Sequence, residues 1–337
     1  MRFLQVGVGG MGNAWTPILA ESPKSELAGF VDVNPEVMAA QAEKFGVQGV
    51  PCFTTLEAAL AAVPCDAVVL VTPPPFHSPH AILAAQAGKH VLTEKPLADT
   101  PAAAKAMVDA CAAAGVTLMV SQNYRRSPGA MTVHDAVHRG VIGPVSDLGH
   151  VAIEFYKAVN FGATNFRTLM EYPLLLDMGI HHVDLLRFVT GADVKSIYAR
   201  SFHPKWSWYH HGDGLTMTFE LTTGAVGSYL GAWSSGGKET PWDGDWRLQG
   251  PLGALLWSAD GITFAAQDGK AVETLPIPDF PVSGINLVVQ QFIESIEAGV
   301  EPPTSGRDNL RSIGIQFAAL ESIRRNAPVE LAELGLW

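Results

Sequence analysis

The chain has 337 residues, of which 47% are hydrophobic and 16% are charged. This length exceeds one ordinary hydrophobic core and indicates two domains, and the composition excludes a disordered chain. The formal net charge is −11 and no basic run exceeds two residues, which argues against a nucleic-acid-binding surface.

Segments that would place the chain in a membrane or outside the cell are also missing from the sequence. The opening MRFLQVGVGG is too short and too rich in glycine for the core of a signal peptide. No stretch approaches the ~20 apolar residues that a membrane span needs. The scattered cysteines Cys52, Cys65 and Cys111 have no metal-ligand spacing and fit reduced thiols. We therefore expect a cytoplasmic protein without membrane or nucleic-acid partners.

Residues 1–122 alternate short β-rich runs with amphipathic, alanine-rich segments. The expected strands are Phe3–Val6, Leu27–Val31, Ala67–Val71, His90–Thr93 and Thr117–Val120. The expected helices are Asn13–Glu21, Pro35–Phe45, Ser78–Ala87 and Pro101–Ala114. Strands that alternate with helices of this length predict an α/β Rossmann domain, which is a parallel, doubly wound sheet that binds nucleotides.

The pattern changes near Ser127, and residues 123–337 form the second expected domain. Its expected helices are Ala130–Arg139, Gly179–Thr190, Leu287–Ala298 and Asn309–Arg325. Its expected strands are Val151–Tyr156, Val194–Phe202, Leu215–Leu221, Ala225–Trp233, Asp245–Gly250 and Gly253–Ser258. Glycine-containing turns join several of these strands, so the pattern predicts an α+β domain with an open, mainly antiparallel sheet.

The first expected strand runs directly into Gly7-Val8-Gly9-Gly10-Met11-Gly12, a G-x-G-x-x-G pattern that then opens a helix. A lone match is weak, but a strand before it and a helix after it are what the motif requires. Gly7 permits the tight turn, Gly9 lets the backbone approach a pyrophosphate, and Gly12 allows the helix to pack closely on the strand. The helix N-terminus offers amide donors to the phosphates. The alternative is a plain tight turn.

The second strand leads to Asp32, twenty residues beyond Gly12. A carboxylate at this spacing accepts hydrogen bonds from the ribose hydroxyls and repels a 2′-phosphate, so NAD is favoured over NADP. The alternative is that Asp32 is only a turn or helix-cap residue before Asn34-Pro35. The sequence thus predicts NAD as the cofactor, with contacts from Gly7, Gly9, Gly10, Met11, Gly12 and Asp32.

Glu94-Lys95-Pro96 follows the strand His90–Thr93, at the edge where ligands of parallel sheets bind. Oxidation of a secondary alcohol needs a base for the hydroxyl proton and a cation or donor for the developing alkoxide. Lys95 in this position can donate to the alcohol oxygen and favour its deprotonated form. The alternative is an ordinary surface lysine at a strand end.

Asp177, His181 and Asp184 have offsets of four and seven, which place all three on one face of a helix. An imidazole with a pKa near ~6.5 suits proton exchange at neutral pH, and a carboxylate one turn away can orient it. Gly179 costs about 1 kcal/mol inside a helix, which indicates that something approaches the backbone closely. This group is the expected source of the acid/base.

Two alternatives stay open for the same residues. Asp177 could be only the N-cap of a helix that ends at Thr190 before Gly191. Asp177, His181 and Asp184 could instead ligate a metal, although we expect none. The nearest other ligand spacing, His210-His211-Gly212-Asp213, is more typical of a polar loop.

Together these motifs resemble the Gfo/Idh/MocA family, which is named after glucose–fructose oxidoreductase, inositol dehydrogenase and a rhizopine catabolism protein. The resemblance rests on Gly7–Gly12, Thr72-Pro73 with His77, Glu94-Lys95-Pro96 and Asp177–Asp184, and it covers essentially the whole chain. It implies a Rossmann domain followed by an α/β domain with an open, mainly antiparallel sheet. Where many members carry a glycine cluster this chain has Glu171-Tyr172-Pro173, a difference that affects the shape of the substrate pocket.

The resemblance also implies roles for individual residues. Lys95, Asp177 and His181 would be a catalytic trio, with His181 as acid/base and Lys95 on the reacting oxygen. A cis peptide is implied before Pro96. Further cofactor contacts are implied for Thr72, Pro73, His77, Glu94, Lys95 and Asn123, and substrate contacts for Tyr124, Arg125, Tyr156, Arg167 and His181.

The sequence therefore predicts an NAD-dependent oxidoreductase that transfers a hydride between a nicotinamide and a ring secondary alcohol of a sugar, anhydrosugar or cyclitol. One alternative is a glycoside hydrolase that uses bound NAD transiently and makes no net NADH. Another is a non-catalytic NAD-binding regulatory protein, which would be expected to lose the Lys/Asp/His set that this chain keeps. An open sheet face would have to be covered, so we expect a homo-dimer or homo-tetramer.

Overall fold

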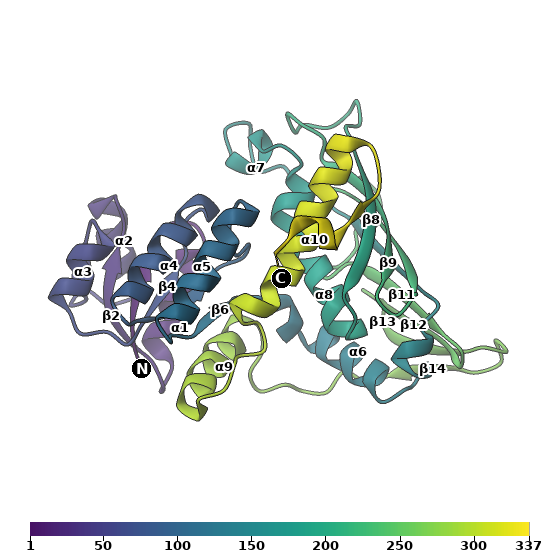
Figure 1. The fold of residues 1–337 in the computed structure, drawn as a ribbon, viewed down its shortest axis with the longest axis horizontal. Coiled ribbons are helices and arrows are strands. Elements are labelled where there is room, and N and C mark those ends of the chain that lie inside the picture. The colour runs from purple at the N-terminus through teal and green to yellow at the C-terminus, as the bar shows by residue number, and fades with distance from the viewer. Residues whose placement is uncertain (337) are drawn as a thin grey trace. The chain divides into compact units, whose positions relative to one another are not determined.

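The computed structural model describes residues 1–336, which divide into two units (Figure 1). The first unit comprises Met1–Asn123 and Val282–Leu310, and the second comprises Tyr124–Pro281 and the chain from Arg311 onward. The division expected from the sequence left Val282–Leu310 in the second domain. The structure groups this segment with the first unit, because its helix packs on the core of that unit.

A parallel sheet of six strands forms the centre of the first unit. Its spatial order reverses direction between β1 and β4, and the carboxyl ends of strands at such a reversal are where these sheets bind ligands. In sheet order the strands are β3 (Cys52–Phe53), β2 (Glu26–Val31), β1 (Arg2–Val6), β4 (Ala67–Leu70), β5 (His90–Thr93) and β6 (Leu118–Val120).

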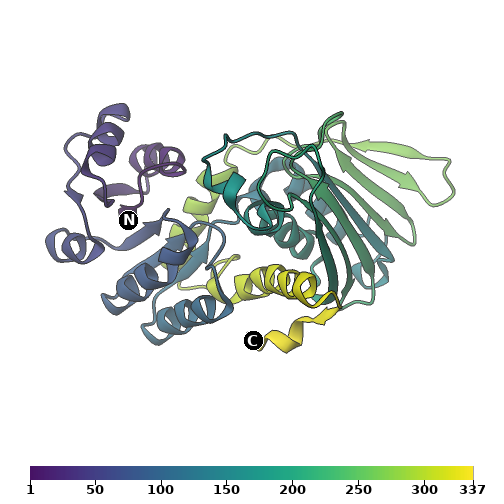
Figure 2. The same ribbon diagram turned by 90° about the horizontal axis from the view of Figure 1, so that it is seen from above.

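Helices cover both faces of this sheet (Figure 2). Crossovers between parallel strands are right-handed, so connections that run in opposite directions from β1 place their helices on opposite faces. Helix α9 packs beside α1, and the rings of Phe3 and Phe292 lie 6.1 Å apart. The helices are α1 (Gly12–Glu21), α2 (Pro35–Lys44), α3 (Leu56–Ala62), α4 (His77–Gln86), α5 (Pro101–Ala113) and α9 (Gly284–Ala298), with a 3-10 turn η1 (Pro74–Phe76) before α4.

The second unit contains a sheet of nine strands. Neighbouring strands run antiparallel except for β7 and β10, which run parallel. In sheet order the strands are β14 (Val272–Leu275), β13 (Gly261–Ala266), β12 (Gly253–Ser258), β11 (Asp245–Gly250), β7 (His150–Tyr156), β10 (Val226–Ala232), β9 (Gly214–Leu221), β8 (Val194–Phe202) and β15 (Val329–Glu330).

Helices lie on one face of this second sheet, and its other face is open within the described part of the chain (Figures 1 and 2). Burial alternates along β7 and β9, as expected for strands with one covered face. The helical segments are η2 (Asn123–Arg126), α6 (Pro128–His138), η3 (Val145–Asp147), α7 (Phe166–Leu169), the π-helical turn η4 (Leu174–Gly179), α8 (Ile180–Thr190), α10 (Gly306–Arg325) and η5 (Leu331–Leu334), and α10 belongs to this unit from Arg311 onward.

The predicted fold class is confirmed, and the differences from the predicted elements have several physical causes. Strands β3 and β15 have two residues each, too few to show a period. In the edge strand β14 and its neighbour β13 only Ile262 is buried, so no alternation of buried and exposed residues marks them. Helix α10 starts earlier than expected, because Ser305 Oγ accepts a hydrogen bond from Asp308 N at 3.1 Å and so caps it.

A buried ion pair joins η2 to α8 inside the second unit. Nε and Nη2 of Arg125 donate to the two carboxylate oxygens of Asp184, each at 2.6 Å. Ser312 Oγ, from α10, donates to Asp184 Oδ1 at 2.6 Å. Both members of the pair are almost inaccessible, and the fork with its third donor satisfies the carboxylate.

Candidate functional site

The glycine turn after β1 has the geometry that the sequence predicted. Gly7 has φ +89°, and a Cβ there would lie 2.7 Å from the carbonyl oxygen of Val71. A Cβ on Gly12 would lie 3.0 Å from the carbonyl oxygen of Gly7. Backbone therefore occupies the space of both side chains, and only glycine allows β1, α1 and the segment after β4 to approach this closely.

Open space lies on the other side of this turn. A Cβ on Gly9 would meet nothing closer than Val37 Cγ1 at 3.9 Å, and one on Gly10 would meet nothing within 4 Å. No side chain of the described residues caps the start of α1 at Met11. The turn thus offers uncapped amides and room for a phosphate group, as a dinucleotide requires.

A buried amide network that the sequence analysis missed holds this turn. Gln5 Nε2 donates to the carbonyl oxygens of Gly7 and Gly12, each at 3.2 Å, and Gln5 Oε1 accepts from Thr16 Oγ1 at 2.9 Å. Gln41 Nε2 donates to the same Gly12 oxygen at 3.1 Å and to Thr16 Oγ1 at 2.8 Å. The signal was a glutamine inside an otherwise apolar, buried strand.

Asp32 lies at the end of β2 and contacts the same turn. Its Oδ2 accepts a hydrogen bond from Val8 N and its Oδ1 accepts one from Asn34 N, each at 3.0 Å. The helix cap itself is Asn34, whose Oδ1 accepts from Glu36 N at 2.9 Å. A carboxylate has about four acceptor positions, so two remain for ribose hydroxyls.

The Thr72-Pro73 loop after β4 supplies a further polar group. Thr72 Oγ1 is buried and has no hydrogen-bond partner among the described residues. Such a hydroxyl is able to form a hydrogen bond with a bound ligand. His77 is fully buried, with Nδ1 2.9 Å from the Pro96 oxygen and Nε2 2.7 Å from the Thr72 oxygen. His77 therefore connects the loop after β4 with the loop after β5 through its two ring nitrogens. Burial lowers the pKa of its imidazole.

Lys95 follows β5 and is only partly buried. The peptide bond between Lys95 and Pro96 is cis, as the resemblance implied. Glu94 Oε2 accepts from Lys95 N at 3.0 Å, and Glu94 Oε1 accepts from the ring nitrogen of the buried Trp15 at 2.8 Å. Both oxygens of the Glu94 carboxylate are therefore used to fix the backbone that carries the lysine.

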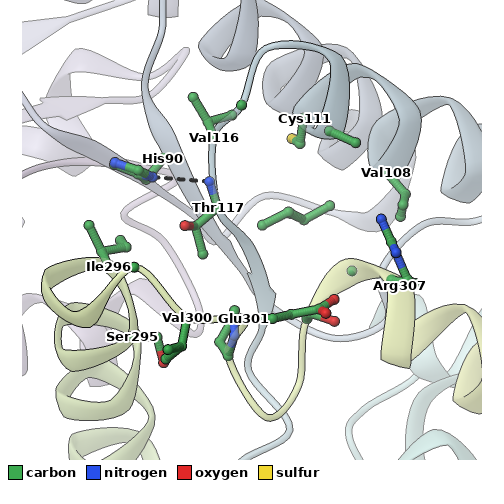
Figure 3. Close-up of a pocket in the computed structure, with 17 residues that line it drawn as sticks. His90, Val108, Cys111, Val116, Thr117, Ser295, Ile296, Val300, Glu301 and Arg307 are labelled. Carbon is green, nitrogen blue, oxygen red and sulfur yellow. Dashed lines mark hydrogen bonds between the residues drawn. The ribbon is translucent and has the colours of Figure 1, made fainter.

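A hollow of about 390 Å³ lies elsewhere in the first unit, beside β6 and the start of α10 (Figure 3). His90 lies at its wall and is the first residue of β5, so the hollow is at the opposite end of that strand from Lys95. His90 Nδ1 accepts from Thr117 N at 3.0 Å, and burial raises the pKa of the Cys111 thiol to about 12. The hollow therefore has no activated nucleophile, and we do not assign the chemistry to it.

In the second unit, Asp177 lies inside the π-helical turn η4, which leads directly into α8. It does not cap the helix, so the N-cap alternative is wrong, whereas Gly191 ends α8 with φ +62° as expected. A Cβ on Gly179 would lie 3.1 Å from the carbonyl oxygen of Leu174, five residues earlier. The close approach expected at Gly179 thus comes from the wide turn itself.

The departure from the family pattern has a backbone consequence. Tyr172 precedes this turn with φ +51°, in the left-handed region that favours glycine. A residue with a Cβ pays roughly 1 kcal/mol or more for this conformation. The chain therefore keeps a glycine-like backbone at the position where its sequence has tyrosine.

His181, Tyr124, Asp177 and Arg167 are brought together. The imidazole of His181 stacks on the Tyr124 ring with centroids 3.9 Å apart and planes inclined by 14°. Burial and the negative charges of Asp243 and Asp177 raise the pKa of the Tyr124 hydroxyl. Arg167 Nε donates to Asp177 Oδ2 at 2.6 Å, and its guanidinium lies over the Phe166 ring at 4.5 Å.

Three other candidates are not part of this group. Asp184 lies three residues after His181 in α8, and its carboxylate is buried in the pair with Arg125. The same pair favours a structural role for Arg125 over the substrate contact that the resemblance implied. Tyr156 lies on the opposite face of β7 from Phe155, whose ring packs 4.8 Å from that of His182.

His182 is fully buried next to His181 in the sequence and has a different environment. Its Nε2 lies 2.9 Å from the carbonyl oxygen of Trp242, which can only accept, so this nitrogen carries the hydrogen. Its Nδ1 then accepts from the Tyr229 hydroxyl at 3.0 Å. Burial lowers the pKa of His182 to about 4.

Neither a membrane span nor a metal centre is found in residues 1–336. No helix in this range is long and apolar enough to cross a bilayer. No three of its His, Cys, Asp and Glu side chains are grouped to hold a metal ion. The arrangement of Asp177, His181 and Asp184 therefore gives no support to the metal alternative.

The sheet order and the glycine turn of the first unit define a dinucleotide-binding protein of the Rossmann type. The family described as "Oxidoreductase family, NAD-binding Rossmann fold" matches residues 1–122, and the "GFO/IDH/MocA C-terminal domain" matches residues 130–256. The chain belongs to the Gfo/Idh/MocA family of oxidoreductases. It is an NAD-binding oxidoreductase.

Known proteins resemble the chain over nearly all of its length. D-Apiose dehydrogenase from Paraburkholderia graminis is 30% identical over 92% of this chain and 84% of its own length. Inositol 2-dehydrogenase from Rhizobium meliloti is 24% identical over 98% of this chain and 99% of its own. The crystal structure of an Agrobacterium radiobacter oxidoreductase with NAD+, L-tartaric acid and magnesium shares the fold, with a TM-score of 0.90, 20% identity and 99% of both chains covered.

We predict that Asp32→Ala shifts the ratio of NADP to NAD affinity toward NADP by at least about tenfold, because a negative charge no longer opposes the 2′-phosphate. Titration calorimetry with both cofactors measures this ratio. Asp32→Asn removes the charge but keeps an oxygen for Val8 N, and it should behave in the same way. Asp66→Asn is the control, because Asp66 lies just before the N-terminal end of β4, whereas Asp32 follows the C-terminal end of β2. An unchanged ratio would show that Asp32 is only a turn residue.

The neutral state of His182 predicts a loss of stability in acid. Its folded pKa, about 4, lies below the unfolded value near ~6.5, so protons bind the unfolded chain more tightly. The contribution of His182 to the free energy of unfolding is fully present above pH ~6.5 and is lost as the pH falls toward about 4. His182→Gln keeps one donor and one acceptor without ionising.

Urea unfolding at pH 7 and pH 5 tests this expectation. Between pH 7 and pH 5 the free energy of unfolding of the wild type should fall by about 2 kcal/mol more than that of His182→Gln, because only the wild type has the lowered His182 pKa. His150→Gln, whose ring is partly exposed on β7, serves as the control and should follow wild type. Equal losses in wild type and His182→Gln would contradict a buried neutral His182.

Proposed function

We propose that the protein catalyses the reversible, NAD-dependent oxidation of a ring secondary alcohol on a sugar, an anhydrosugar or a cyclitol. The observation that carries this proposal is the stacked Tyr124–His181 pair with the Arg167–Asp177 ion pair, in a chain whose NAD-binding unit carries Lys95. The names of the relatives support the substrate class, since one acts on apiose and the other on inositol.

Each of the proposed catalytic residues has a distinct task. NAD, when bound, supplies the group that accepts or returns the hydride. Lys95 donates to the alcohol oxygen through its ammonium group and favours the alkoxide. His181 takes the hydroxyl proton in the direction of oxidation and returns it in the direction of reduction. Asp177 orients the substrate and the imidazole.

Contacts within each unit support these tasks. The Tyr124 ring covers one face of the His181 imidazole and so limits the rotation of the proton acceptor. Arg167 fixes the Asp177 carboxylate and is itself held between the rings of Phe161 and Phe166. Glu94 uses both carboxylate oxygens to hold the segment of Lys95. Side chains held in this way need little reorganisation in the transition state.

We also propose that the chain forms a homo-dimer or homo-tetramer through the open face of the second sheet. Val226 and Leu230 are exposed on this face in β10, at 56% and 41% of their surface. Val226 also lines a hollow of about 450 Å³, together with residues that include Tyr198 and Pro328. An exposed apolar area of this kind on a sheet fits a second copy of the same chain.

A panel of inositols, aldoses and anhydrosugars with NAD tests the proposed reaction. We expect at least one ring alcohol to be oxidised, with reduced cofactor detected by its absorbance and a ketone detected by mass spectrometry. Release of a cleaved glycoside without net reduced cofactor would instead indicate the oxidation–elimination chemistry of a hydrolase. Binding of NAD without turnover of any member would contradict the proposal.

We predict that Lys95→Ala and His181→Ala each lower turnover at least ~100-fold, because each removes a positioned electrostatic or acid/base group. NAD affinity should change little in either variant. Lys89→Ala, just before the opposite end of β5, and His138→Ala, at the end of α6, are matched controls that should retain activity. Near-normal turnover in Lys95→Ala and His181→Ala would contradict the assigned roles.

A further inference from the structure

The loop between β10 and β11 brings a second carboxylate, that of Asp243, to the start of α6, close in the chain to Tyr124. Asp243 Oδ2 accepts a hydrogen bond from Ser127 Oγ at 3.1 Å, although the two residues are 116 positions apart. Ser127 is the N-cap of α6 and lies three residues after Tyr124. The Asp243 charge opposes ionisation of the Tyr124 hydroxyl, so the carboxylate lies within electrostatic reach of the ring that covers His181.

The backbone of this loop is fixed by buried ring nitrogens. His182 donates to the Trp242 carbonyl oxygen at 2.9 Å, and Trp246 Nε1 donates to the Asp243 carbonyl oxygen at 2.6 Å. Gly244 closes the turn with φ +84°, and a Cβ there would lie 3.0 Å from the Glu154 oxygen. The backbone of Asp243 is therefore held on both sides, and its side chain is held by the hydrogen bond from Ser127.

The residues before Asp243 add further anchors. Thr240 N donates to the Tyr156 oxygen at 3.1 Å, and Tyr156 N donates to Thr240 Oγ1 at 3.1 Å. Glu239 Oε1 accepts from Ala158 N at 3.1 Å, and Glu239 Oε2 pairs with Lys157 at 3.0 Å. Six hydrogen bonds or ion pairs thus hold this loop against β7, α8 and β11.

The cationic side chains near the Tyr124–His181 pair form ion pairs with carboxylates other than Asp243. Arg167 compensates Asp177, and Lys157 compensates Glu239. Among the described residues Asp243 makes no ion pair, and its one side-chain partner is the neutral Ser127 hydroxyl. Burial raises the pKa of the Asp243 carboxyl to about 6, so the group is charged at neutral pH without a cationic partner.

We propose that Asp243 is a positioning residue of the reaction, whose charge acts across the Tyr124 ring on His181 and favours the protonated imidazole. The proposal rests on the acid/base role of His181. A negative charge beyond the Tyr124 ring stabilises the imidazolium that forms when His181 takes the substrate proton. Ser127 and the anchored loop hold that charge at a fixed distance.

The experiment follows His181 itself and needs no substrate. The full-length protein is labelled with ¹³C at the histidine Cε1 positions, and the His181 signal is assigned by its loss in His181→Asn. Its chemical shift is then titrated with pH in wild type, in Asp243→Asn and in Asp245→Asn. Asp245 lies two residues further on, in β11, and provides the same change of charge outside the loop.

In wild type we expect the His181 curve to show a second inflection near pH 6, where Asp243 titrates. In Asp243→Asn this inflection should disappear and the His181 pKa should fall by about 0.5 to 1 unit, because a nearby negative charge is lost. Asp245→Asn should follow wild type. An unchanged curve in Asp243→Asn, or an equal shift in Asp245→Asn, would overturn the proposal.

Tyr124→Phe tests the route of the effect. This variant keeps the stacked ring and removes the hydroxyl, so the shift that Asp243→Asn causes should keep its size in this background, because the charge acts across the ring. Loss of the shift in this background would overturn that route. Circular dichroism of each variant checks the fold.

Turnover gives a separate result. With a substrate from the panel, Asp243→Asn should move the acid limb of the kcat profile to lower pH, because the imidazole then deprotonates at lower pH. Absence of turnover in wild type would count against the proposed reaction only, and the titrations of His181 would still decide whether Asp243 acts on it.

Discussion

The forked pairing of Arg125 with Asp184 determines where the functional side chains of the second unit lie. Tyr124 directly precedes the arginine in η2, and His181 lies one turn before the aspartate in α8. A single interaction between these two segments therefore sets the distance between the phenol ring and the imidazole. Both partners of the ion pair are needed, because a buried guanidinium or carboxylate that lost its partner would be strongly destabilising. Ser312 gives the carboxylate its third donor, so α10 takes part in the same arrangement.

In the first unit, neutral amides hold the back of the glycine turn. In this turn, neighbouring backbone occupies the space where the side chains of Gly7 and Gly12 would be. Two buried glutamines, Gln5 and Gln41, donate hydrogen bonds to carbonyl oxygens of the turn. Neutral amides suit this position, because a fixed charge behind the turn would compete with the phosphates in front of it. The two units thus solve the same problem, a fixed set of polar atoms, with different chemistry: amides behind a phosphate turn, and ion pairs behind an imidazole.

Local patterns in the sequence were sufficient for the parts of the site that depend on neighbours in the chain. Gly7, Gly12 and Asp32 have roles that follow from one strand, one turn and one helix, and a short motif contains that information. The structural role of Asp184 was not predicted, because no local signal in the sequence marked Arg125, the residue that pairs with it. Asp243 was not found at all, since its significance arises from contact with a residue more than a hundred positions earlier. Polar residues inside apolar strands, such as Gln5, are the signal that a second reading of the sequence could use.

The wide turn before α8 has a consequence for comparing this chain with others. A π-helical turn holds one more residue than an α-helical turn over nearly the same rise, so it corresponds to a single inserted position. A protein that places the same carboxylate and imidazole on a continuous α-helix would need a different number of residues between them. Alignments without gaps across Leu174–Gly179 would then pair Asp177 with the wrong column. Searches for functional counterparts should therefore superpose the two side chains in space before they count the residues that separate them.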